Sequence, residues 1–113
     1  MLVTKNINNI LVVRLKEPQR LNALIAEAVK EQLLEYFNKP STSVVFDLQG
    51  VSFIDSSGFS VFLSAMKAAN NNFGQFKFCN VNSDLMELFK LLQLHHVFEI
   101  YTELDPCIES FNQ

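Results

Sequence analysis

The segment from Ser43 to Lys67, SVVFDLQGVSFIDSSGFSVFLSAMK, joins an apolar run of strand length to an apolar pattern of helical period. The run SVVFDL is rich in β-branched residues and is too apolar for a strand with one solvent-exposed face. This composition favours a strand that is buried on both faces. After Gly58, apolar residues recur at the 3.6-residue spacing of a helix. A buried strand that leads directly into an amphipathic helix is typical of an α/β fold with a largely parallel sheet.

The rest of the chain continues this alternation of strands and helices. Two short strands flank Asn8-Asn9, whose side chains tolerate tight turns, and apolar spacing predicts a helix from Leu21 to Phe37, before Pro40. Further on, the pattern predicts a strand in QFKFCNV, a helix in NSDLMELFKLLQL capped by Ser83, a strand in HVFEIY and a short helix over residues 104–111. The predicted fold is therefore α/β in the order β-β-α-β-α-β-α-β-α, with a mostly parallel central β-sheet of four to five strands and about four helices.

Composition narrows the class of protein. With 113 residues, of which 49% are hydrophobic, we expect one domain with a single core over 1–113. The net charge of −3 comes without a long run of either sign, which argues against a nucleic-acid surface. No apolar run approaches the ~20 residues of a membrane span and no signal-peptide pattern opens the chain, so we expect a cytoplasmic location. Cys79 and Cys107 lack a CxxC partner and are expected to be reduced core residues.

The tetrapeptide Asp55-Ser56-Ser57-Gly58 interrupts two apolar segments. The predicted elements place it at the amino end of the second helix, beyond the carboxyl end of a central strand. In open α/β sheets, ligands and partners bind at the carboxyl ends of the strands. Three interpretations are open: a helix cap, a nucleophilic serine, or an acceptor of phosphate.

A cap needs only Asp55 or Ser56, because either side chain can accept from the free amides of the first turn and contribute roughly 1 kcal/mol. A nucleophilic serine needs a general base and donors for an oxyanion. The nearest match to the GxSxG elbow, residues 58–62, lacks its second glycine, and His95 and His96 lie near the end of the third helix. No cluster of residues has metal-ligand spacing. We therefore expect neither an enzyme nor a metal site.

A phosphate acceptor fits the position on physical grounds. The free amides and the dipole of a helix amino end favour an anion, so a serine there can carry phosphate without unfolding the helix. The phosphate adds about −1.5 to −2 charges, and Asp55 beside it would increase the repulsion of an acidic or apolar partner. Gly58 has no side chain and would let a partner approach the backbone closely. Such a switch changes affinity rather than fold.

The same residues resemble the signature of the STAS domain, specifically that of the bacterial anti-sigma-factor antagonists. The resemblance consists of a strand ending in Asp47-Leu48, the crossover Val51-Ser52-Phe53-Ile54 and the tetrapeptide at 55–58, with Phe59 where leucine is usual. The downstream strand, helix and last strand are similar as well. Two positions depart from the family pattern. LKEPQRLNA stands where a Gly-Glu-Leu/Ile-Asp pattern is common, which puts Arg20 and Asn22 beside the site, and Gln93 replaces a glycine.

The resemblance implies partner switching. The unphosphorylated protein would bind an anti-sigma factor that is also a serine kinase of the histidine-kinase-like ATPase type, and thereby free a sigma factor. The kinase would phosphorylate Ser56 and then dissociate from the protein. A serine phosphatase would remove the phosphate and restore the binding-competent form. The kinase supplies ATP and metal, so no cofactor is expected on this chain.

The resemblance also implies roles for the neighbouring residues. Asp55 would hold the acceptor loop, and Ser57 and Gly58 would begin the helix. Phe53 and Phe59, together with Val51 and Phe62, are expected to border the partner contact, with membership of the core as the alternative for each. The alternative function is a STAS module that is not phosphorylated and serves as a scaffold or regulatory subunit of a lipid-transport or stress-sensing complex. Self-association as a homodimer through the apolar N-terminal strand is also open, unless the last helix covers that strand.

Overall fold

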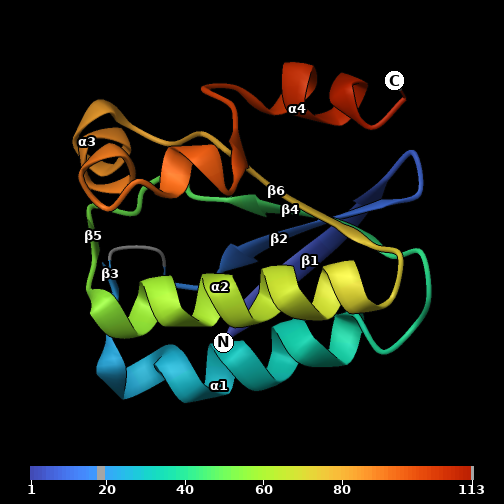
Figure 1. Cartoon of the computed structure of the whole chain (residues 1–113), viewed down its shortest axis with the longest axis horizontal. Helices are drawn as coiled ribbons and strands as arrows, with labels where there is room; N and C mark the ends of the chain where they lie inside the picture. The colour runs from blue at the N-terminus through green and yellow to red at the C-terminus, as the bar shows by residue number, and fades with distance from the viewer. Residues whose placement is uncertain (18–19, 113) are drawn as a thin grey trace.

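A five-stranded sheet with the strand order β1-β2-β4-β6-β7 forms the centre of the molecule (Figure 1). The computed structural model describes residues 1–17 and 20–112. The sheet strands are β1 (Leu2–Ile7), β2 (Ile10–Leu15), β4 (Ser43–Asp47), β6 (Gln75–Cys79) and β7 (Glu99–Ile100). Only the first pair of neighbours is antiparallel, and the other three are parallel. The predicted α/β class, the mostly parallel sheet and the order of the main elements are confirmed.

The predicted asparagine pair forms the turn of the hairpin between β1 and β2. Asn8 and Asn9 both have left-handed backbone angles, with φ of 54° and 66°. A two-residue turn of this kind matches the twist of the flanking strands, and asparagine is one of the few residues that adopts it readily. Strand β1 is one edge of the sheet, and its exposed residues include Lys5, a charge that disfavours pairing with another strand.

The helices lie on both faces of the sheet (Figure 1). They are α1 (Ala23–Tyr36), α2 (Ser56–Asn71), α3 (Ser83–Leu91), the 3-10 turn η1 (Leu94–His96) and α4 (Leu104–Ser110). Residues of α1, α2 and α3 share the larger core on one face, and α4 packs on the opposite face. In the part of the chain that the structure describes, no helix is both long and apolar enough to cross a membrane.

Two helix starts differ from the sequence predictions. Helix α1 begins at Ala23 rather than Leu21, because Asn22 is extended and its Oδ1 accepts from Leu24 N at 3.0 Å. Leu24 has the helical spacing of the apolar residues from Leu21 to Phe37, which predicts that it is buried, but it is 92% exposed because it lies in a first turn that faces solvent. In α3 the cap is Asn82 and not Ser83, because the Asn82 Oδ1 accepts from Leu85 N at 2.9 Å.

A second, two-stranded sheet was not predicted from the sequence. It pairs β3 (Arg20–Leu21) with β5 (Phe53–Ile54) in parallel, so that Leu21 lies beside Ile54. The backbone N–H of Asp55 also donates to Leu21 O at 3.2 Å. We call this pair of short strands the β3–β5 ribbon. It brings the amino ends of α1 and α2 together.

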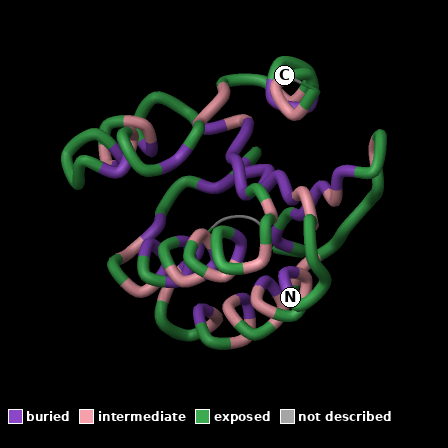
Figure 2. The backbone as a smooth tube through the Cα atoms, turned by 45° about the vertical axis from the view of Figure 1, so that its right-hand side comes forward, coloured by how far each residue is buried: buried purple, intermediate pink, exposed green. Residues whose placement is uncertain are grey.

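Phenylalanine side chains fill the space between the sheet and the helices. Strand β4 confirms the expectation of burial on both faces, because Val44, Val45 and Phe46 are all 0% exposed. Phe78 is also fully buried, and its ring centroid lies 4.7 Å from that of Phe62 on α2. Figure 2 shows that the buried segments concentrate on the central strands. This core fixes the position of α2 on the sheet.

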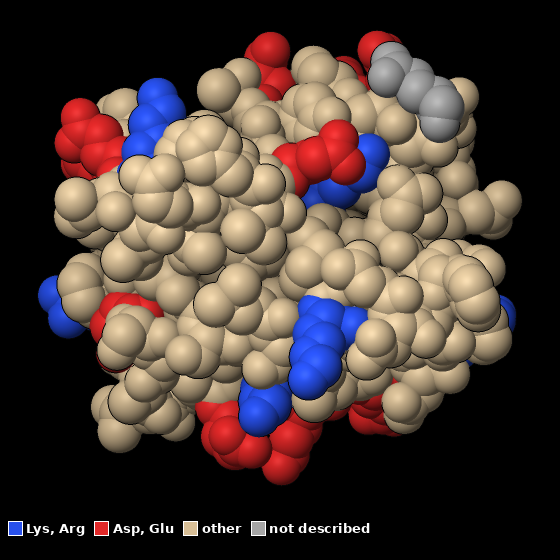
Figure 3. Space-filling view, in the orientation of Figure 1, with Lys and Arg blue, Asp and Glu red and all other residues tan. Residues whose placement is uncertain are grey.

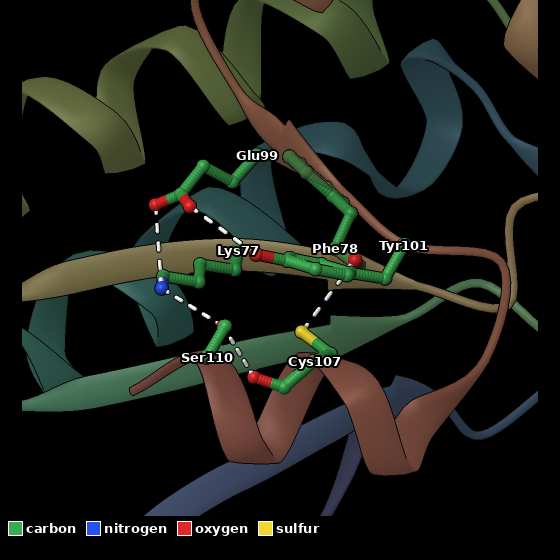
Figure 4. Close-up of polar contacts among 6 residues, drawn as sticks. All are labelled: Lys77, Phe78, Glu99, Tyr101, Cys107 and Ser110. Atoms are coloured by element: carbon green, nitrogen blue, oxygen red, sulfur yellow. Dashed lines mark hydrogen bonds and ion pairs between the residues drawn. The ribbon is translucent and has the colours of Figure 1, made fainter. Parts of the chain in front are cut away.

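Helix α4 is held on its face of the sheet by a buried lysine (Figure 4). Lys77 on β6 is 4% exposed. Its Nζ donates to Ser110 Oγ at 2.9 Å, lies 3.3 Å from the Glu99 carboxylate and sits 4.4 Å from the centroid of the Phe111 ring. Because a short helix is not stable alone, these contacts and the apolar residues beneath them keep α4 in place.

Both cysteines lie between α4 and the sheet. Cys79 and Cys107 are fully buried free thiols, and the Cys107 Sγ donates to Phe78 O at 3.7 Å (Figure 4). Burial raises the pKa of each thiol to about 12. They are therefore neutral core residues, since a thiol with such a pKa forms little of the reactive thiolate at neutral pH.

Candidate functional site

The predicted site lies where β4, the β3–β5 ribbon and α2 meet, at the amino end of α2 (Figure 1). After β4 the chain stays tied to the sheet, because Leu48 N donates to Cys79 O at 3.0 Å and Val51 N donates to Leu48 O at 3.0 Å. The short strand β5 follows, and α2 then begins directly at Ser56. The tetrapeptide thus occupies the edge of the sheet that the sequence predicted.

Asp55 caps α2 and also ties α2 to α1. Its Oδ1 accepts from Gly58 N at 3.1 Å, which confirms the predicted cap. Its Oδ2 accepts from Ala23 N at 3.2 Å, 32 residues away in the chain. The second bond was not predicted, because only the β3–β5 ribbon brings Ala23 close. One carboxylate therefore satisfies an amide at the start of each helix, which fixes the loop that carries Ser56.

The two serines of the tetrapeptide have different surroundings. Ser56, the first residue of α2, is exposed. Ser57 is half-buried and lines a shallow groove between α1 and α2 together with Glu27 and Lys30. A second protein can therefore reach the Ser56 hydroxyl more easily than the hydroxyl of Ser57.

Gly58 is buried, which corrects the expectation that it opens the backbone to a partner. A Cβ added here would lie 2.7 Å from the Ile54 Cγ2 and 2.9 Å from the Leu21 Cγ. The missing side chain thus lets the first turn of α2 pack directly on the β3–β5 ribbon. Glycine is needed here for close packing inside the protein rather than for access from outside.

Of the four apolar residues expected to border a partner contact, only Phe53 is on the surface. Phe53 is 41% exposed, whereas Val51 and Phe62 are 0% and Phe59 is 5% exposed. The Phe59 ring lies 5.2 Å from that of Phe89 on α3, within the core. The alternative of core membership therefore applies to Val51, Phe59 and Phe62. Phe59 and Phe62 act by holding α2 in place.

The positions that depart from the family pattern have defined structural roles. Asn22 is the cap of α1, and Arg20 is exposed on the β3–β5 ribbon with its guanidinium carbon 5.4 Å from the centroid of the Phe53 ring. Gln93 has a left-handed φ of 60°, a conformation that glycine adopts at least cost. Leu24, which is almost fully exposed, lines the same surface hollow as Arg20 and Asn22, and its exposure was not predicted.

Surface charge and potential metal ligands are further features of the described residues. Charged side chains of both signs are interspersed on the face shown in Figure 3, and neither sign forms a continuous patch there. Within residues 1–17 and 20–112, no group of three or more His, Cys, Asp or Glu residues is placed to hold a metal ion. What the site offers chemically is an exposed hydroxyl on a rigid helix end.

We expect Asp55→Ala to lower the free energy of unfolding by about 1–2 kcal/mol, because amides of two helices lose their acceptor. Asp55→Asn should lose less, since one amide oxygen can still cap Gly58. Urea denaturation followed by circular dichroism measures both. The matched control is Asp84→Ala, which removes an exposed carboxylate from the first turn of α3. Equal losses in Asp55→Ala and Asp84→Ala would contradict the double cap.

The chain is similar to known proteins in both sequence and fold. The family model described as "STAS domain" matches residues 1–106. An anti-sigma-B factor antagonist of Listeria monocytogenes is 31% identical over 80 residues, which cover 71% of this chain and 70% of the relative. A putative anti-sigma factor antagonist from Thermotoga maritima has a similar crystal structure, with a TM-score of 0.88, 22% identity and coverage of 99% of this chain and 95% of that chain.

A second solved structure, of the anti-sigma factor antagonist SpoIIAA "in its Unphosphorylated Form", has a TM-score of 0.71 with 14% identity, and covers 99% of this chain and 98% of that chain. At these identities the two structures support the fold. The family match extends over almost the whole chain. The protein belongs to the STAS domain family.

Proposed function

We propose that this protein is an anti-sigma-factor antagonist whose binding to its partner is controlled by phosphorylation of Ser56. The observation that carries the proposal is the exposed Ser56 hydroxyl at the amino end of α2, fixed by the double cap of Asp55. The names of the relatives support the function as an antagonist. The description of one relative as unphosphorylated supports control by phosphate.

The proposed partner is an anti-sigma factor that is also a serine kinase of the histidine-kinase-like ATPase type. Binding of the unphosphorylated protein to it would free a sigma factor in the cytoplasm. In the kinase reaction the Ser56 Oγ forms a bond to the γ-phosphorus of ATP, the bond to ADP breaks, and the hydroxyl proton passes to a base of the kinase. A serine phosphatase hydrolyses the phosphoserine and restores the hydroxyl.

Phosphate at Ser56 changes the surface without changing the fold. The side chain is exposed, so no packing is lost, and the helix dipole favours the anion. The phosphate adds to the charge of the neighbouring Asp55 carboxylate and opposes a partner that contacts α2 and Phe53. We assign Phe53 to the contact because it is the exposed member of the predicted set. Ser57, Gly58 and Phe59 support the geometry from beneath.

A binding experiment with matched charge variants tests the proposal. The immobilised wild type, Ser56→Asp and Ser83→Asp are each exposed to an extract of the source cells, and the retained proteins are identified by mass spectrometry. Ser83 is the control because it is also an exposed first residue of a helix, α3. We expect an ATPase-fold kinase on the wild type and on Ser83→Asp, with retention by Ser56→Asp at least about tenfold lower, a loss of about 1.4 kcal/mol.

Incubation with the retained kinase and ATP should then place phosphate on Ser56 and leave Ser56→Ala unlabelled. Equal retention by all three proteins, or labelling of Ser56→Ala, contradicts the proposal. Retention of a transport complex or a large scaffold by all three proteins would instead support the alternative of a STAS module that is not phosphorylated.

A further inference from the structure

Arg20 and Phe53 form a pair on the outer side of the β3–β5 ribbon. They are direct neighbours in the parallel register, as are Leu21 and Ile54. Leu21 and Ile54 are buried under Gly58, and because successive side chains of a strand point to opposite sides, Arg20 and Phe53 face solvent. The Arg20 guanidinium carbon lies 5.4 Å from the Phe53 ring centroid, a cation–π contact.

The charge of Arg20 is held by this ring rather than by a carboxylate. Among the described residues, the ion pair within 4.0 Å is that of Lys77 with Glu99 on the α4 face, and Arg20 has none. The Asp55 carboxylate, two residues after Phe53 in the chain, already accepts from the backbone amides of Gly58 and Ala23. An exposed cation–π contact is weak, so Arg20 can exchange it for a stronger anionic partner.

Ser56 lies within reach of Arg20. Phe53 is adjacent to Arg20 across the ribbon, and Ser56 follows Phe53 by three residues. An extended chain over residues 53–56, with a rise of about 3.3 Å per residue, and a strand spacing of about 4.8 Å at right angles to it would separate the Cα atoms of Arg20 and Ser56 by about 11 Å. An extended arginine and a phosphoserine side chain together span such a separation. Both side chains are exposed, so no buried group blocks the movement.

We propose that Arg20 is the receptor for phosphate on Ser56: the phosphorylated serine draws the guanidinium off the Phe53 ring and pairs with it. The inference rests on the proposed function, because it concerns the state in which Ser56 carries phosphate. A guanidinium binds a phosphate dianion through two parallel hydrogen bonds, which an aromatic face cannot match. The pairing also offsets the repulsion between the phosphate and Asp55.

The exchange gives phosphorylation a second effect on the surface. It adds negative charge at Ser56, and it also removes the positive charge from above Phe53 and uncovers the ring. Of the other charged residues near the first turns, Glu27 on α1 opposes the phosphate and Lys30 on α1 favours it, both from the groove lined by Ser57. Arg20 is the basic residue that the ribbon places beside Ser56.

The test uses protein in which phosphoserine is installed at position 56 during synthesis by codon reassignment, so no kinase is required. The pKa of the phosphate is measured by ³¹P NMR titration in the otherwise native chain, in Arg20→Gln and in Arg20→Lys. A nearby cation favours the dianion, so we expect Arg20→Gln to raise the phosphate pKa by at least about 0.3. Arg20→Lys should restore most of the difference, because the charge is kept. The control Lys39→Gln removes the same charge from the exposed turn beyond the carboxyl end of α1 and should leave the phosphate pKa unchanged.

A second measurement follows the ring. The aromatic signals of Phe53, labelled selectively, should shift on phosphorylation of the native chain and remain in place in Arg20→Gln. A phosphate pKa that is the same with and without Arg20, or Phe53 signals that do not respond to phosphate, would overturn the proposal. These results are separate from the proposed function: if no kinase is retained by the wild-type chain, the function fails, whereas the Arg20 contact is still decided by NMR.

Discussion

Replacement of Phe78 by alanine is expected to lower the free energy of unfolding by about 3–5 kcal/mol. Phe78 is 0% exposed and is the most connected ring in the core. Its centroid lies 4.7–6.3 Å from those of five other phenylalanines, namely Phe46, Phe62, Phe76, Phe89 and Phe98. These rings come from β4, α2, β6, α3 and the segment before β7, so alanine leaves a cavity that no single element can close by moving.

Equilibrium unfolding in urea measures this loss, provided that the variant unfolds with the same denaturant slope as the wild type. The matched control is Phe73→Ala, because the Phe73 side chain is 84% exposed. We expect that control to stay within about 0.5 kcal/mol of the wild type. Similar losses for the two variants would mean that Phe78 is not the centre of the core.

Gly58→Ala is expected to destabilise the protein by about 1–3 kcal/mol, although alanine in a helix is ordinarily better than glycine by about 1 kcal/mol. The expected sign is reversed because the new methyl group would lie 2.7 Å from Ile54 Cγ2 and 2.9 Å from Leu21 Cγ. Both neighbours are buried in the β3–β5 ribbon and have little room to move. Thermal and urea unfolding both report this change.

Two further variants separate overpacking from a general effect on α2. Ser60→Ala changes an exposed residue of the same helix and should be neutral or slightly stabilising. Ile54→Ala removes the Cγ2 atom that the new methyl group would meet, so the cost of Gly58→Ala should shrink in that background. The close packing would be contradicted if Gly58→Ala stabilised the protein. It would also be contradicted if Gly58→Ala lowered the free energy of unfolding equally with and without Ile54→Ala.

The main elements of the fold were predictable because they carry periodic signals. The apolar run of β4 implied burial on both faces, and all three residues from Val44 to Phe46 are fully buried. The helical spacing after Gly58 predicted α2, and the Asn8-Asn9 pair predicted the hairpin turn. The Asp-Ser-Ser-Gly tetrapeptide also identified the amino end of α2, because caps are short local patterns in which one side chain bonds to its own backbone neighbours.

The start of α1 was placed wrongly for the same reason that the β3–β5 ribbon was missed. Arg20–Leu21 and Phe53–Ile54 are strands of two residues each, too short to show a period of two. Leu21 and Leu24 fit the spacing of the helix that follows, so the pattern assigned both of them to its buried face. The pairing of strands 33 residues apart makes that helix begin only at Ala23 and leaves Leu24 in solvent.

The sequence by itself determined the order of elements, the buried central strand and the exposed serine at a capped helix end. Each of these follows from residues that are neighbours in the chain. Only the tertiary structure decided that Asp55 also binds Ala23, that Gly58 is closed off by Leu21 and Ile54, and that Arg20 lies on Phe53. All three depend on the β3–β5 ribbon, because contacts between distant segments arise only when the chain has folded.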